Sequence, residues 1–214
     1  MAEAPDEKII SPRFSCGIVT ADDLLALWKL LKETPGCKVK LTGAVLVGIE
    51  DAGQRKAFRE KAGFPLSPVS GARVRPVKVC AGDYICPNNR REILALSRFL
   101  DARFCGMEAA AKTTISVSGC GRCCAQSKVC DIGVVAGNDG FYVYLGGASG
   151  AAPRAGVLFA SGVRPEDMER LINGIIEVHK AHGTAGMRLG QVIDKIGIAV
   201  FRDKVSSVCG LTVL

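Results

Sequence analysis

The chain has 214 residues, of which 48% are hydrophobic and 23% are charged, with a formal net charge of +7 and ten cysteines. This composition is typical of a globular protein and excludes a disordered chain. No apolar run reaches the ~18 residues that span a bilayer, and no run of five basic residues indicates nucleic-acid binding. We therefore expect neither membrane nor nucleic acid as a partner. The positive charge suits an anionic substrate, an anionic cofactor or an acidic redox protein, unless the chain is merely a basic enzyme.

The N-terminal residues 1–10 are polar and acidic, which does not fit a signal peptide. We expect a cytoplasmic protein for this reason. Structural disulfides are rare in reducing cytosol, so ten cysteines indicate metal or redox chemistry.

The first third of the chain predicts a flexible arm, residues 1–13, and then a small α+β unit. Thr20 and Asp23 have the spacing of a capping box at the start of a helix. The predicted buried face of this helix consists of Leu24, Leu27, Trp28 and Leu31. Residues 39–49 predict a strand or hairpin that bends at Gly43, and residues 52–62 predict a second helix. The segment PLSPVSG, residues 65–71, is the predicted linker.

The rest of the chain mixes strands and helices without a regular βαβ alternation, which favours an α+β fold. Hydrophobic patterns predict strands at 74–79, 113–118, 132–136 and 141–145, and helices at 89–104, 166–180 and 189–196. The last two strands flank an Asn138–Asp139–Gly140 turn, as in a hairpin.

Four cysteines form two pairs, Cys80 with Cys86 in C-x5-C spacing and Cys120 with Cys124 in C-x3-C spacing. Each pair follows a predicted strand and is flanked by glycine, which lets the backbone wrap around a bulky group. Four converging thiolates suit an iron–sulfur cubane. Zinc, disulfides and unliganded buried cysteines are the alternatives, although C-x5-C is not a usual zinc spacing. Cys123 also has C-x2-C spacing with Cys120, but neighbouring side chains point apart, so we expect only Cys124 to bind.

These residues lie in segments that resemble the siroheme and [4Fe–4S] nitrite and sulfite reductase family. The segment KTTISVSGCGRCCAQSKVCDIGVVAGNDGFYVYLGGASG is similar to its cofactor segment, and VKVCAGDYIC to its first cysteine pair. NNRREILALSRFLDARFCG resembles the helix between the pairs, and MRLGQVIDKIGIAVF the closing helix. Common members carry two copies of this unit. This chain has one, as in the low-molecular-weight assimilatory-type sulfite reductases.

The resemblance implies a ferredoxin-like half-domain over residues 14–66 and a siroheme and iron–sulfur domain over residues 72–214. It implies an enzyme that reduces sulfite to sulfide with six electrons from an external donor such as a ferredoxin. The expected cofactors are siroheme and a [4Fe–4S] cluster. A siroheme nitrite reductase is the first alternative. An iron–sulfur electron-transfer module and a protein that handles tetrapyrroles are the others.

The resemblance also implies ligands. The expected cluster ligands are Cys80, Cys86, Cys120 and Cys124, and Cys124 would also join the cluster to the siroheme iron. One departure from the family pattern lies beside them: Gly121 and Arg122 follow the third cysteine, where the family commonly has Pro and Asn. This departure bears on the local turn and removes no ligand.

Basic residues match the family's substrate-holding positions at Arg73 and Lys112, and less closely at Lys40. Cationic donors suit a small anion that loses its oxygens as water. Strand alternation would place Arg73 and Arg75 on one face. Each basic residue could instead be a solvated surface charge.

Siroheme carries eight carboxylates, which basic side chains would have to neutralise. The candidates are Arg75, Lys78, Arg90, Arg122 and Arg154. Gly146 and Gly147 are expected to let the backbone approach the macrocycle, with a plain turn as the alternative. His179 and His182 are expected to be ordinary surface histidines of a helix. Because a single unit lacks the second copy that backs it in common members, we expect a homodimer, with a monomer as the alternative.

Overall fold

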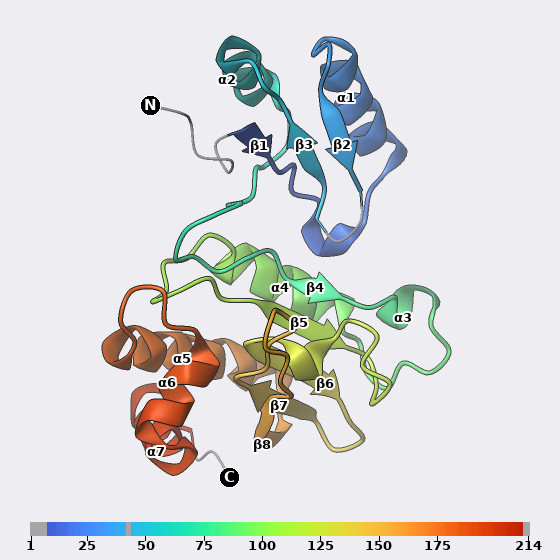
Figure 1. Cartoon of the computed structure of the whole chain (residues 1–214). Helices are drawn as coiled ribbons and strands as arrows, with labels where there is room; N and C mark the ends of the chain where they lie inside the picture. The colour runs from blue at the N-terminus through green and yellow to red at the C-terminus, as the bar shows by residue number, and fades with distance from the viewer. Residues whose placement is uncertain (1–7, 42–43, 212–214) are drawn as a thin grey trace. The chain divides into compact units, whose positions relative to one another are not determined.

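The computed structural model describes residues 8–41 and 44–211, which belong to two compact units, Met1–Ser70 and Gly71–Leu214 (Figure 1). The division lies inside the predicted linker. Each unit has its own hydrophobic core. Both units mix helices and strands, which confirms the α+β class that the sequence predicts.

The first unit contains β1 (Ile9–Ile10), the 3-10 helix η2 (Ser15–Gly17), α1 (Ala21–Lys32), β2 (Lys38–Lys40), β3 (Leu46–Gly48) and α2 (Ala52–Lys61). Its sheet has the order β1-β3-β2, and both strand pairs are antiparallel. The prediction of a flexible arm is wrong for β1, because it pairs with β3 and buries Ile10. Residues 1–7 and the predicted bend at Gly43 lie outside the described residues.

Helix α1 shows what the hydrophobic pattern could and could not predict. The capping box is confirmed: Asp23 N–H donates to Thr20 Oγ1 at 3.1 Å, and Thr20 N–H donates to the Asp23 carboxylate at 2.9 Å. The predicted buried face is confirmed for Leu27 but wrong for Leu24 and Trp28, which are 52% and 53% exposed. Leu30, which was not predicted, is buried. The sequence LLALWKLL is apolar on nearly every side, so periodicity cannot identify the face that meets the sheet.

The second unit contains a five-stranded sheet in sequence order: β4 (Lys78–Val79), β5 (Ile115–Ser118), β6 (Ile132–Ala136), β7 (Phe141–Leu145) and β8 (Val157–Val163). β4, β5 and β6 are parallel, and β6, β7 and β8 are antiparallel. The predicted β6–β7 hairpin is confirmed. The predicted strand at 74–79 is shorter, because Val74 makes only an isolated bridge to Thr113 and Pro76 has no N–H to donate. β8 was not predicted.

The helices of this unit are α3 (Gly82–Ile85), α4 (Leu94–Phe104), the 3-10 helices η3 (Ser127–Val129) and η4 (Pro165–Asp167), α5 (Met168–His182), α6 (Leu189–Ile196) and α7 (Ile198–Cys209). α6 has the predicted bounds, whereas α3 and α7 were not predicted. α4 begins five residues later than predicted, because the Asp83 carboxylate accepts the N–H groups of Ile93 and Leu94 and caps the helix there.

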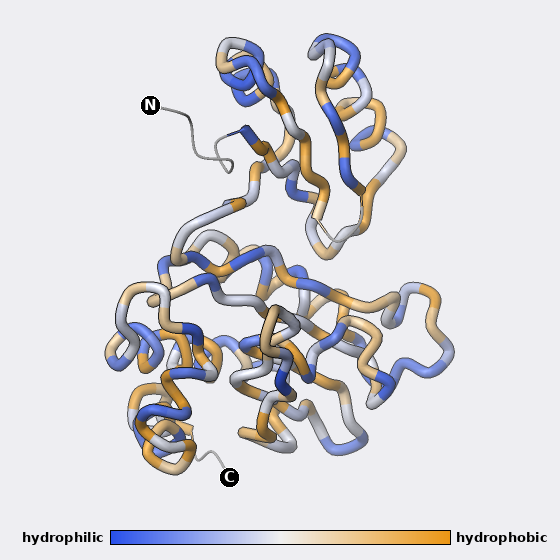
Figure 2. The backbone as a smooth tube through the Cα atoms, viewed as in Figure 1, coloured by the Kyte–Doolittle hydropathy of each residue, from blue (hydrophilic) through white to orange (hydrophobic). Residues whose placement is uncertain are grey.

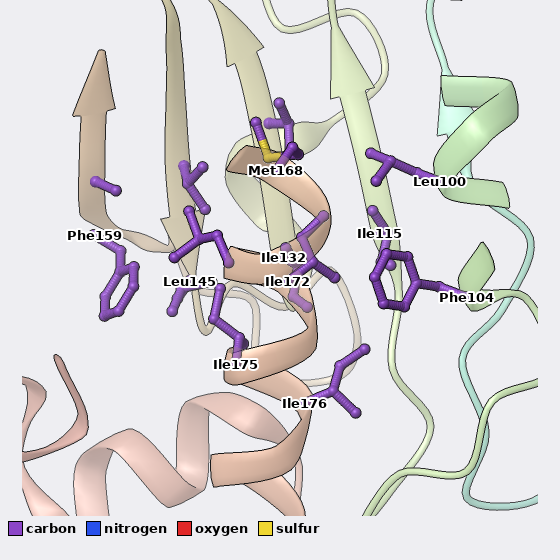
Figure 3. Packing of buried hydrophobic residues seen from close by; sticks show 14 of the residues in the cluster. Leu100, Phe104, Ile115, Ile132, Leu145, Phe159, Met168, Ile172, Ile175 and Ile176 are labelled. Atoms are coloured by element: carbon purple, nitrogen blue, oxygen red, sulfur yellow. The ribbon is translucent and has the colours of Figure 1, made fainter. Parts of the chain in front are cut away.

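The core of the second unit lies between the sheet and α5. Ile172, Ile175 and Ile176 of α5 are fully buried and face strand residues such as Ile132 (Figure 3). Figure 2 shows hydrophobic and hydrophilic stretches alternating along the helices of both units, as expected for helices that bury one side. In the described part of the chain, no helix is long and apolar enough to cross a membrane.

Candidate functional site

Two cysteine-bearing loops leave the sheet at the same end. β4 and β5 are parallel with Val79 opposite Val117, so the loops that follow them both begin at the carboxyl edge. Cys80 N–H donates to Val117 O at 3.2 Å, and Gly119 N–H donates to Cys80 Sγ at 3.2 Å. Cys120 comes next in the chain. The sheet register therefore brings the first and third predicted ligands to adjacent strand ends.

The first loop folds into the short helix α3 before it reaches Cys86. Gly82 begins this helix with φ 52°, and Cys86 N–H donates to Gly82 O at 2.9 Å. Asp83 accepts the N–H groups of Ile93 at 2.8 Å and Leu94 at 3.0 Å. Burial raises the pKa of the Asp83 carboxyl, but these donors outweigh it and hold the pKa below its ordinary value. The ionised carboxylate thus fixes this loop to the start of α4.

The segment that follows Cys86 packs directly on the strand end before Cys120. Arg90 N–H donates to Gly119 O at 2.8 Å. A Cβ atom at Gly119 would lie 1.9 Å from Asn89 Oδ1, so only glycine fits there. This close approach explains the glycine before the third cysteine.

The second loop separates two neighbouring thiols. Cys123 has φ 58°, and its Sγ accepts Lys128 N–H at 3.2 Å, so this thiol is turned back toward its own chain. Cys124 is exposed. Gln126 is also left-handed, with φ 60°. This arrangement favours Cys124 over Cys123 as the ligand, which stays a prediction.

Hydrogen bonds of buried serine hydroxyls hold the second loop against the sheet. Ser116 Oγ donates to Ala125 O at 2.6 Å, and Ser127 Oγ lies 3.2 Å from Ser116 Oγ and 2.8 Å from Ser118 Oγ. All three serines are fully buried. A Cβ at Gly133 would lie 1.8 Å from Ser127 O, so β6 also presses against this network. The end of the loop is therefore tied to β5 and β6.

The placement of the four thiols on two adjacent loops suits a cubane cluster. All ten cysteines are free. Within residues 8–41 and 44–211, no three His, Cys, Asp or Glu side chains are grouped to hold one metal ion. In a [4Fe–4S] cluster each thiolate binds its own iron, so the four sulfurs do not meet at one point. Four thiols on two loops at one sheet edge, one of them already accepting a backbone N–H, suit such a cluster.

A cluster of cations lies where β4 and β5 begin. Lys112 precedes β5, and Arg75 and Lys78 lie before and on β4. Partial burial lowers the pKa of the Lys112 ammonium, and the charges of Arg75, Arg188 and Lys78 lower it further, while Asp131 opposes them. The structure thus groups Lys112 with Arg75, Lys78 and Arg188. An excess of positive charge suits an anion.

Arg188 and Asp131 belong to this cluster, and sequence reasoning missed both. The Arg188 guanidinium binds the buried Asp131 carboxylate through two bonds, Nε to Oδ1 at 3.0 Å and Nη2 to Oδ2 at 2.6 Å. Asp131 begins the segment DIG after Cys130, and Arg188 lies in MRLG, both within segments already singled out. No sequence signal could show that these distant residues pair.

The main chain of Arg73 lies beside the segment that carries Lys112, because Thr113 N–H donates to Arg73 O at 3.1 Å. The Arg73 guanidinium donates to Gly106 O at 3.0 Å and lies 3.6 Å from Glu108, beside the loop that follows α4. Lys40 is exposed on β2 and belongs to the first unit. Their predicted contact with substrate stays a prediction.

The predicted siroheme-pairing residues differ in their surroundings. Arg90 and Arg122 are exposed beside the cysteine loops. Arg90 also lines a shallow hollow of about 260 Å³, together with Gly121 and Lys128. A larger hollow of about 670 Å³, which Arg90 also lines, lies over α4 and η4.

Arg154 already has a partner within the protein. It forms an ion pair with Asp194 at 2.5 Å and 3.1 Å, which raises the pKa of the Arg154 guanidinium and lowers the pKa of the Asp194 carboxyl. A siroheme carboxylate would therefore have to compete with Asp194 for Arg154.

Packing of the chain on itself accounts for the two glycines predicted to approach the macrocycle. A Cβ at Gly147 would lie 2.8 Å from the carbonyl oxygens of Lys128 and Cys130. Gly146 has φ 78°, and a Cβ there would lie 3.0 Å from Gly190 Cα. Their contact with siroheme stays a prediction, since it is not needed to explain either glycine.

The expectation of a surface histidine is wrong for His179, which is 1% exposed. Its Nε2–H donates to Met187 O at 2.8 Å, while Nδ1 is buried with no partner among the described residues. Burial lowers the pKa of the imidazole. The neutral ring therefore holds the residue that precedes Arg188. His182 is half-buried at the end of α5.

Comparison with known proteins places these features in a family. The family model described as "Nitrite and sulphite reductase 4Fe-4S domain" matches residues 70–211. An assimilatory-type sulfite reductase of Nitratidesulfovibrio vulgaris is 26% identical over 199 residues, which cover 92% of this chain and 91% of the relative. The large subunit of a Klebsiella oxytoca NAD(P)H nitrite reductase is 32% identical over 174 residues, 78% of this chain but 18% of the relative. The NirA protein of Mycobacterium tuberculosis has the same fold, with a TM-score of 0.81 at 15% identity over 96% of this chain and 41% of that chain.

Proposed function

This chain belongs to the nitrite and sulphite reductase 4Fe–4S domain family, whose cofactors are siroheme and a [4Fe–4S] cluster, and we propose that it reduces sulfite to sulfide. One observation carries the proposal. The same two strands, β4 and β5, begin beside Arg75 and Lys112 and end in the loops that hold the thiols. In this proposal the substrate anion and the cluster would bind at opposite ends of one rigid pair of strands.

The choice of sulfite is supported by the sulfite reductase relative, whose alignment covers nearly the whole of both chains. Nitrite is the second candidate, because the nitrite reductase relative has the higher identity of the two. The chain spans only a small part of that relative, and we give the full-length match more weight.

Four thiolates would hold the cluster in this proposal, with Cys124 shared by the siroheme iron; the ligands are Cys80, Cys86, Cys120 and Cys124. Cations would pair with the siroheme carboxylates; the candidates are the exposed Lys78, Arg90 and Arg122, the half-buried Arg75 and, in competition with Asp194, the half-buried Arg154. When bound, these cofactors would supply electrons one at a time. Sulfite needs six of them, which an external donor protein would deliver.

Substrate binding and proton supply fall to Lys112, with Arg73 and Lys40 as further candidates. The three sulfite oxygens leave as water, so protons must arrive repeatedly during one reaction. Burial and the neighbouring cations lower the pKa of Lys112, which makes its ammonium a more ready proton donor than an exposed lysine. Its charge also attracts the anion.

An optical spectrum of the purified protein, with iron, acid-labile sulfide and extracted tetrapyrrole measured beside it, tests the cofactors. Sulfite and nitrite reduction with an artificial electron donor then tests the substrate, and we expect a higher kcat/KM for sulfite. A cluster without tetrapyrrole would identify an electron-transfer module. A higher kcat/KM for nitrite would replace the proposal with the second candidate.

Neutral replacements test the substrate contacts. Lys112→Gln and Arg73→Gln should each keep the cofactor spectrum and lower kcat/KM roughly tenfold or more, because a charge-assisted contact contributes about 1.5–3 kcal/mol. Lys180→Gln, on the exposed end of α5, is the control and should change nothing. Unchanged kinetics in both test variants would remove these residues from the site.

The remaining parts of the proposal concern assembly and location. We keep the homodimer and the cytoplasmic location as predictions, the latter because thiolate ligands and free cysteines require reducing conditions. Light scattering of the cofactor-loaded protein decides the first. A mass near 22.5 kDa, that of one chain, would contradict the homodimer.

A further inference from the structure

Both the side chain and the main chain of Arg188 make hydrogen bonds within the unit. Its guanidinium makes a two-bond fork with the Asp131 carboxylate, which is 1% exposed. Its backbone N–H donates to Gln191 Oε1 at 2.8 Å, which caps the start of α6. His179 holds the preceding carbonyl, that of Met187. Both the main chain and the side chain of Arg188 are therefore fixed.

The same carboxylate ties Arg188 to the segment that carries Lys112. Asp131 Oδ2 accepts Thr114 N–H at 2.8 Å and Thr114 Oγ1–H at 2.7 Å, in addition to the Arg188 bond. Thr114 is two residues from Lys112, and Arg75 N–H donates to Thr113 O at 2.8 Å. Four segments distant in sequence thus meet at one point beside the start of β5.

Charge balance at this point depends on Arg188. Burial is the largest cause of the lowered Lys112 pKa; among the charged groups, Arg75, Arg188 and Lys78 lower it further and Asp131 raises it. Asp131 would be an uncompensated buried carboxylate without Arg188, and it would then attract the Lys112 proton more strongly. Removing Arg188 therefore removes a positive charge that repels the Lys112 ammonium and strengthens the attraction of Asp131 for it. Both changes should raise the pKa of Lys112.

We propose that Arg188, locked by Asp131, is a positioning residue that sets the charge around Lys112 and so controls when Lys112 holds its proton. It acts through Lys112 rather than by touching the substrate. The proposal rests on the proposed function only for the identity of the anion that Lys112 serves. In that role Arg188 helps to lower the pKa of Lys112, which makes its ammonium a more ready proton donor than an isolated lysine.

The pH dependence of Lys112 reactivity tests this directly. The purified, cofactor-loaded protein is labelled with trace acetic anhydride across a pH series, and mass spectrometry measures the fraction of Lys112 acetylated, with Lys56 of α2 as internal reference. Only the neutral amine reacts. We expect Arg188→Gln to move the Lys112 midpoint to higher pH, while Arg188→Lys, which keeps the charge, should leave it near the wild-type value.

A second variant should shift the Lys112 labelling midpoint in the opposite direction. Asp131→Asn removes a carboxylate that favours protonation of Lys112, so the midpoint should move to lower pH. Arg103→Gln breaks an exposed ion pair with Glu169 elsewhere in the unit and should leave the midpoint unchanged. Circular dichroism identifies any variant that does not fold. An unmoved midpoint in whichever of Arg188→Gln and Asp131→Asn folds would overturn the proposal.

Labelling does not depend on turnover, so it separates this proposal from the proposed function. Loss of sulfite reduction in the wild-type protein would overturn the function and leave the labelling midpoints interpretable. Where sulfite is reduced, the alkaline limb of the pH–rate profile should move with the labelling midpoint in the same variants. A purely structural role would lower the rate at every pH without moving the limb.

Discussion

The two cysteine-bearing loops leave the same sheet edge but are held by different forces. Asp83 ties the first loop, residues 80–86, to α4 through hydrogen bonds to Ile93 and Leu94 that are at most partly buried. Ser127 ties the end of the second loop, residues 120–127, to β5 through hydroxyls that are fully buried. An exposed polar contact that is lost can be replaced by water, whereas a buried one cannot. The second loop should therefore tolerate less change.

The backbone conformations of the two loops also indicate that the second loop is the more constrained one. The first loop places glycine, Gly82, at its left-handed position. The second places Cys123 and Gln126 in left-handed conformations that side chains disfavour. Such strain persists only where the surroundings enforce it. The buried serine network beneath the second loop supplies that enforcement.

Removing single thiols tests whether both loops serve one cluster, and has the largest expected effect. Serine at Cys80, Cys86, Cys120 or Cys124 should abolish or severely reduce cluster content, because a hydroxyl is a poor iron ligand. Iron and acid-labile sulfide in the purified variants measure this. Cys123→Ser should keep the cluster, since that thiol bonds to Lys128 N–H.

Full cluster content in any one of the four variants would remove that residue from the ligand set. Loss of the cluster in Cys123→Ser would show that the wrong neighbour was chosen in the second loop. Cys37→Ser in the first unit is the control for cysteine replacement in general.

Ser127→Ala tests the buried anchor of the second loop. It leaves the hydroxyls of Ser116 and Ser118 without this partner in a dry site, which costs about 1–3 kcal/mol of unfolding free energy. Urea denaturation measures the loss. Ser207→Ala, at an exposed position in α7, should cost little. Equal urea midpoints for Ser127→Ala and the wild type would refute the idea that buried serine hydroxyls hold the second loop.

Asp83→Ala tests the exposed anchor of the first loop and should have a smaller effect. Loss of a helix cap costs about 1 kcal/mol, and cluster release on dilution with a chelator should become faster. Asp51→Ala removes the cap of α2, where Asp51 accepts Gln54 N–H at 2.7 Å, and serves as the matched control. It should cost similar stability without faster cluster release. Equal release rates in both variants would contradict a role for Asp83 in holding the cysteine loop.

The sequence predicted those parts of the fold that depend on local signals. The capping box at Thr20, the hairpin of β6 and β7 and the bounds of α6 follow from residues close together in the chain. The start of α4 was missed because its cap, Asp83, comes from a separate loop. β8 was missed because an edge strand with a bulge lacks a regular alternation.

The candidate site also contains some residues that local sequence signals predict and others that depend on contacts between distant residues. Cysteine spacing and a recognisable segment predicted the thiols, and the structure brings Cys80 beside Gly119 as a parallel register requires. The Arg188–Asp131 pair could not be predicted, because it joins residues 57 positions apart. His179 was misjudged for a related reason: a polar residue on a helix is normally exposed, and only α5 packing shows that this one is buried.

Gln126→Gly tests the left-handed backbone of the second loop and should have the smallest effect. Glycine adopts the left-handed conformation without the clash that Gln126 bears at φ 60°. Relief of strain opposes the added freedom of the unfolded chain, so we expect a gain of about 0.5 kcal/mol. Thermal unfolding of the cofactor-loaded protein measures it. Ala102→Gly at an exposed position of α4 should instead lose about 0.5–1 kcal/mol. If both glycines lowered Tm equally, the left-handed residue of the second loop would carry no strain, and its difference from the first loop would lie in the serine hydroxyls alone.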